Sequence, residues 1–115
     1  MRLFSRRNKK KPSVEVDDFS VRRHLANGKT EETRWEHLGE VSIMTNDRGP
    51  WEFDVFWVLI EDDGQTGCVI PTALPEAESI LDIVQKLPGF DNEKLIEAMS
   101  SGQNNQFILW KKPES

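Results

Sequence analysis

The histidines, the single cysteine and a pair of adjacent aspartates are the residues of this chain whose types could carry out chemistry. His24 and His37 have no cysteine beside them and do not form an H-x-x-x-H motif, so we expect no metal site. Cys68 lies between Gly67 and Val69 in an apolar segment without positive neighbours. This setting favours a buried, unreactive thiol over a nucleophile.

Asp62 and Asp63 precede Gly64, a pattern typical of a solvated turn rather than of a general acid–base pair. The chain contains no G-x-S-x-G elbow, no Walker loop and no G-x-G-x-x-G motif. We therefore expect no enzymatic activity, no cofactor and no metal. The alternative is an enzyme whose site is assembled from residues without a linear signature.

The charge is divided unevenly along the chain. Residues 1–12 contain six basic groups and no acid: Arg2, Arg6, Arg7, Lys9, Lys10 and Lys11. Because the whole chain carries −5 and these residues contribute +6, residues 13–115 carry −11. We expect a disordered basic arm over 1–12 and a single acidic domain over 13–115, which argues against nucleic-acid binding by the domain.

Length and composition are those of one small globular domain. The 115 residues have a mass of 13.3 kDa, which allows one hydrophobic core. A single cysteine excludes an internal disulfide and favours a reducing compartment. The N-terminus lacks the apolar region of a secretory signal, and no segment approaches the roughly 18 apolar residues of a membrane span. The expected location is the cytoplasm.

The segment 53–60 is expected to form a strand that is buried on both sides, because it is apolar on both alternating faces. One face carries Phe53, Val55, Trp57 and Leu59, and the other carries Asp54, Phe56, Val58 and Ile60. A strand of this kind is covered on both sides, by a helix, a second sheet or a partner.

Further strands are expected over 14–16, 20–25, 30–35, 40–45, 66–70 and 106–110, with Asn27-Gly28 turning a hairpin. Apolar residues at helical spacing predict a main helix from Pro75 to Leu87. Asp91 can cap a second, shorter helix, whose buried residues would be Leu95, Ile96 and Met99. Strands followed by helices indicate an α+β domain with a largely antiparallel sheet.

Four features together resemble the bacterial pleckstrin-homology-like domains over residues 14–90. They are the Val21–Trp35 hairpin, the pattern Trp35-x-x-Leu38-x-x-Val41-x-Ile43, the Asp63-Gly64 turn leading to Pro71, and a helix ending in Leu87-Pro88-Gly89-Phe90. The resemblance implies a curved, largely antiparallel sheet of about six or seven strands with one main C-terminal helix. To this the chain adds a second short helix and a closing strand. Many such domains are binding or scaffolding modules, which favours a non-enzymatic role.

We therefore expect a small binding or scaffolding module whose partner is a protein. Trp51 follows Gly49-Pro50 in the loop before the strand over 53–60, where an exposed tryptophan could anchor a partner. The candidate surface combines Arg48, Trp51 and Phe53. The alternative is that Trp51 folds back as a lid on the mouth of the curved sheet. The oligomeric state stays open.

A peripheral module that binds anionic lipid is the alternative function. The arm, with Leu3 and Phe4 beside its basic groups, could contribute about 1 kcal/mol per basic group near an anionic membrane surface. Contacts from the first hairpin would come from Arg22, Arg23 and Lys29. Glu31 and Glu32 follow immediately and would largely offset that field. A merely solubilising arm is the third possibility.

Overall fold

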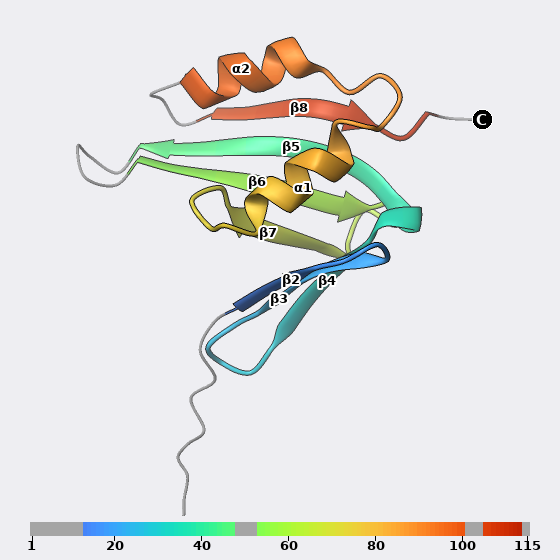
Figure 1. The fold of residues 1–115 in the computed structure, drawn as a ribbon, viewed down its shortest axis with the longest axis vertical. Coiled ribbons are helices and arrows are strands. Elements are labelled where there is room, and N and C mark those ends of the chain that lie inside the picture. The colour runs from blue at the N-terminus through green and yellow to red at the C-terminus, as the bar shows by residue number, and fades with distance from the viewer. Residues whose placement is uncertain (1–12, 48–52, 101–104, 114–115) are drawn as a thin grey trace, which may run out of the picture.

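The computed structural model describes residues 13–47, 53–100 and 105–113, which form an α+β fold of two antiparallel sheets and two α-helices (Figure 1). The three-stranded sheet contains β2 (Ser13–Val16), β3 (Ser20–His24) and β4 (Thr30–Arg34) in that order. The four-stranded sheet has the order β7-β6-β5-β8, formed by β7 (Gly67–Pro71), β6 (Phe53–Glu61), β5 (Leu38–Asp47) and β8 (Asn105–Lys111). A short 3-10 turn, η1 (Trp35–His37), joins the two sheets.

The first hairpin forms as its sequence predicts. Gly28 adopts a φ of +90°, which residues other than glycine rarely adopt. The Asn27 carboxamide oxygen accepts a hydrogen bond from the Lys29 N–H at 2.9 Å. β3 and β4 then pair with Val21 opposite Thr33, and both side chains are buried. The alternation of residue types gives this small sheet one buried face and one polar face.

Alternation also defines the inner face of the four-stranded sheet. Rows of paired residues place Val41, Leu59 and Cys68 on one line and Ile43, Trp57 and Ile70 on the next. All six side chains are buried. Gly67 permits a close approach here, because a Cβ at this position would lie 2.7 Å from the Leu59 carbonyl oxygen.

Both helices lie on that inner face. α1 (Ala77–Val84) crosses the sheet and buries Ala77, Ile80 and Val84, while α2 (Asn92–Ser100) runs beside β8 (Figure 1). Asp91 caps α2 as expected, since its carboxylate accepts the Lys94 N–H at 2.9 Å.

Three details of the sequence prediction are wrong. The strands divide into two sheets of three and four strands, because the chain turns at η1 and packs the first hairpin against the second sheet. α2 has nine residues against eight for α1, so there is no main C-terminal helix with a shorter second one, although both helices precede a closing strand, β8, as predicted. Of the three residues expected to be buried on α2, Leu95 is buried, but Ile96 and Met99 are exposed.

The core lies between the two sheets and under the helices. Among the contacts that join the two sheets, two are buried: the Thr33 hydroxyl donates to the Leu59 carbonyl at 2.9 Å, and the Cys68 thiol lies 3.5 Å from the Val21 carbonyl. Trp57 and Trp110 are buried. Trp35 lies half-buried in η1, with its indole N–H donating to the Asp17 carbonyl.

Candidate binding surfaces

The surface predicted from the sequence falls mostly outside the described residues. Arg48 and Trp51 belong to 48–52, and Phe53 begins β6 but its side chain is not described. The six basic residues of the arm also lie outside the described residues. The structure therefore leaves these as predictions and places only Arg22, Arg23 and Lys29.

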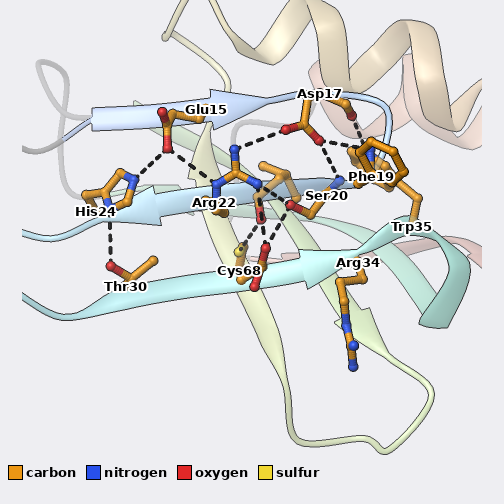
Figure 2. A network of polar contacts seen from close by, with 12 residues as sticks. Glu15, Asp17, Phe19, Ser20, Arg22, His24, Thr30, Arg34, Trp35 and Cys68 are labelled. Atoms are coloured by element: carbon orange, nitrogen blue, oxygen red, sulfur yellow. Dashed lines mark hydrogen bonds and ion pairs between the residues drawn. The ribbon is translucent and has the colours of Figure 1, made fainter.

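Arg22 is held by three carboxylates on the outer face of the three-stranded sheet (Figure 2). Its guanidinium lies 3.3 Å from Glu15, 3.1 Å from Asp17 and 3.6 Å from Glu32. Hydrogen bonds to Asp17 and Glu15 raise the pKa of Arg22. Because negative charges surround it, this arginine offers little field to an anionic surface.

The same network holds its acids in the charged form. Hydrogen bonds from His24 and Arg22 lower the pKa of Glu15, with His24 Nε2 at 2.8 Å from the carboxylate. The backbone N–H groups of Ser20 and Phe19, followed by Arg22, lower the pKa of Asp17. The outer face of this sheet is thus polar and internally paired (Figure 2).

Arg23 points the other way and binds the edge of the four-stranded sheet. Its guanidinium donates to the Val69 carbonyl, while the Val69 N–H donates to the Glu31 carboxylate at 3.3 Å. Arg23 and Glu31 are direct cross-strand partners. The pair therefore satisfies the backbone of β7 much as a neighbouring strand would, and only Lys29 of the three predicted hairpin cations stands exposed in the turn.

The residues considered for chemistry occupy structural positions. Burial raises the pKa of the Cys68 thiol to about 11, so the side chain is a neutral thiol at physiological pH. Asp62 pairs with Lys112 at 2.9 Å, and Asp63 accepts the N–H groups of Gln65 and Thr66 in an exposed turn. Within 13–47, 53–100 and 105–113, no group of three histidine, cysteine or carboxylate side chains could hold a metal ion.

The outer face of the four-stranded sheet is apolar. The strand pairing places Met44 beside Phe56 in one cross-strand row. The next row contains Val69 on β7, Val58 on β6 and Ile108 on β8, which lies two strands from Val58. Met44 is 37% exposed and Ile108 is 40% exposed, while Phe56, Val58 and Val69 are partly exposed. Among the side chains that the structure describes, charge enters this face where Lys111 lies 4.0 Å from Glu40. At the other end of the face, the register places Asp54 opposite Asn46.

A groove on the opposite face runs between the two helices. Its volume is about 320 Å3, and Trp57 and Thr72 form its floor. The α1 wall consists of Ala77, Glu78 and Leu81, and the α2 wall consists of Leu95, Ile96, Met99 and Ser100. Sequence reasoning missed this groove because helical spacing shows which residues of α2 are apolar, but not how closely α1 approaches them.

No family model, curated protein or solved structure matches the chain. Among the described residues, neither helix has the length and apolar character that crossing a lipid bilayer demands.

Proposed function

We propose that this chain is a non-enzymatic binding module that holds a partner protein against the outer face of its four-stranded sheet. The observation that carries the proposal is the set of partly exposed apolar side chains on that face: Met44, Phe56, Val58, Ile60, Val69 and Ile108. Both described helices lie on the other face, above Trp57. The central strand is thus covered on one side by its own chain and on the other by the partner.

The chemistry of the face suits a flat protein surface. The rows from Met44 to Phe56 and from Ile108 to Val69 contain no charged side chain. Ser42 is fully buried between them, and its hydroxyl accepts a hydrogen bond from the Gln106 carboxamide at 3.2 Å. A partner can therefore pack on these two rows as one sheet packs on another, without desolvating a charge there.

Charge substitutions on the two outer faces test the proposal. Met44→Lys and Ile108→Lys place a cation on the apolar face, and Thr30→Lys places the same cation on the polar face of the other sheet. We expect the first two to abolish recovery of a partner from the native cell, or to dissociate a self-complex measured by light scattering, while Thr30→Lys keeps either one. Equal behaviour of all three variants, with unchanged melting, would contradict the proposal.

The partner surface predicted from the sequence can extend this one. Arg48, Trp51 and Phe53 follow β5 and lead into β6, the two central strands of the sheet. Trp51→Ala should weaken partner recovery with a shift of only a few degrees in melting temperature. Unfolding of this variant would instead place Trp51 in the core. The resemblance to pleckstrin-homology-like domains and the cytoplasmic location remain predictions from the sequence.

The anionic-lipid alternative depends on residues 1–12. Of the hairpin cations, Arg22 is neutralised by three carboxylates and Arg23 is bound to the edge of β7. The described domain therefore adds little to such binding, and sedimentation with anionic vesicles should follow the arm. Equal pelleting after charge reversal of Lys9, Lys10 and Lys11 would exclude the arm as an anchor.

A further inference from the structure

The groove between α1 and α2 is an apolar site whose walls retain exposed side chains. Ile96 is 68% exposed and Met99 is 49% exposed, although both stand beside the buried Trp57 floor. At one end the Gln85 carboxamide donates to the Asn92 side chain at 3.0 Å and links the end of α1 to the start of α2. The groove is thus closed at that end and leads toward the start of α1.

The rim of the groove is acidic. Glu78 lines it, and Asp82 follows one helical turn later on the same face of α1. On α2, Glu93 lies one turn before Ile96, and all three carboxylates are exposed. Lys86 lies beyond the end of α1, near the closed end. An apolar floor with an acidic rim selects an occupant that is both apolar and basic.

The N-terminal segment enters the fold beside the open end of this groove. Ser13, the first residue of β2, lines a common depression with Leu74 and Glu76, immediately before α1 begins. Twelve residues in extended conformation span about 40 Å, whereas the eight residues of α1 extend about 12 Å. Residues 1–12, outside the described residues, are therefore long enough to lie along the whole groove.

Residues 1–12 also have the chemistry that the groove selects. Leu3 and Phe4 are apolar and adjacent; one basic residue precedes them, five follow, and the segment contains no acid. We propose that the groove binds this segment of the same chain, with Leu3 and Phe4 between Leu81 and Met99 and the basic residues against Glu78, Asp82 and Glu93. Docking would withhold the basic residues from anionic surfaces and would leave the outer face of the four-stranded sheet free.

A spin label on the full-length chain tests this docking. Ser5→Cys provides an accessible thiol beside Phe4, while the native Cys68 is buried and unreactive toward the label. We expect the oxidised label to reduce the methyl signal intensities of Met99 and Ile96 relative to the reduced label. Leu3→Asp with Phe4→Asp, or Glu78→Gln with Asp82→Asn and Glu93→Gln, should restore those signals.

Two results would overturn the proposal. Unchanged Met99 and Ile96 signals in the labelled chain would show that the segment does not occupy the groove. The second result concerns a mixture of spin-labelled chains with isotope-enriched chains that carry no spin label. Signal loss that occurs only in this mixture would show that a second copy supplies the segment. The amide chemical shifts of β2 and β3 serve as the control for folding, since these strands lie outside the groove.

Discussion

The outer faces of the two sheets differ in polarity. On the three-stranded sheet, Arg22 lies directly between Glu15 and Glu32 across the strands, and His24 joins Glu15 to Thr30 (Figure 2). On the four-stranded sheet, the cross-strand rows of the outer face contain partly exposed aliphatic and aromatic side chains instead. Water can cover the first face at little cost, whereas burial by a partner lowers the free energy of the second.

The comparison also separates two uses of arginine in consecutive positions. Arg22 holds three acids on the water-facing side, and Arg23 binds the edge of β7. Because alternate residues of a strand point to opposite faces, the pair Arg22-Arg23 cannot form one basic patch. A cluster of basic residues in a strand sequence is therefore weak support for an anion-binding surface.

The largest expected effect distinguishes the two faces of β6. Trp57→Ala truncates a side chain that is 3% exposed and should cost roughly 3–5 kcal/mol of unfolding free energy. Val58→Thr, the next residue on the opposite face, should cost about 1 kcal/mol or less. Denaturant unfolding measures both, and equal losses at the two positions would contradict the assignment of an inner and an outer face.

A smaller effect is expected where the three-stranded sheet meets β7. Arg23→Ala removes the donor to the Val69 carbonyl and leaves that backbone group without its side-chain partner, which should cost about 1–3 kcal/mol. Hydrogen exchange should accelerate at β7 before it accelerates in the centre of the sheet. Arg22→Ala is the matched control, and a larger loss for Arg22→Ala would reverse the roles of the two residues.

Low pH should destabilise the three-stranded sheet before it destabilises the four-stranded sheet. The folded-state pKa values of Glu15 and Asp17 are lowered from ordinary values of 4.5 and 3.8, so their contribution to stability is present above those values and is lost as pH falls through the folded pKa. Amide exchange in β2 and β3 should therefore increase below about pH 4 before the four-stranded sheet opens. Simultaneous opening of both sheets would contradict this selectivity.

Asp63 requires a separate control in that experiment. The backbone N–H groups of Thr66 and Gln65, with the Thr66 hydroxyl, lower the pKa of Asp63 to about 2. Its contribution is likewise present above its ordinary value of 3.8 and lost as pH falls toward 2. Asp63→Asn removes this titration and should leave the acid response of β2 and β3 in place.

The sequence predicted most of the secondary structure, because its signals are local. Asn27-Gly28 predicted the hairpin, Asp91 predicted a helix cap, and the apolar residues of 53–60 predicted a strand. The division into two sheets depends on contacts between distant segments, such as Thr33 with Leu59, which no local pattern encodes. The exposure of Ile96 and Met99 depends likewise on how α2 is rotated over the sheet, and the period of the sequence does not specify this.

The sequence predicted that β6 is covered on both faces, but it did not predict what covers the outer face. The two-sided pattern of β6 required a cover and allowed a helix, a second sheet or a partner. Met44 on β5 lies beside β6, and Ile108 on β8 lies beside β5, so the register places both residues on this face. Their partial exposure supports the choice of a partner.

The most direct test of that choice is site-specific photo-crosslinking in the native cell. A photoreactive residue at Met44 samples the outer face of the four-stranded sheet, and one at Thr30 samples the polar face of the other sheet. We predict a discrete protein adduct, either a second copy or another chain, from position 44 and none from position 30. The absence of an adduct at position 44 in a folded, expressed protein, or equal adducts at both positions, would contradict the account.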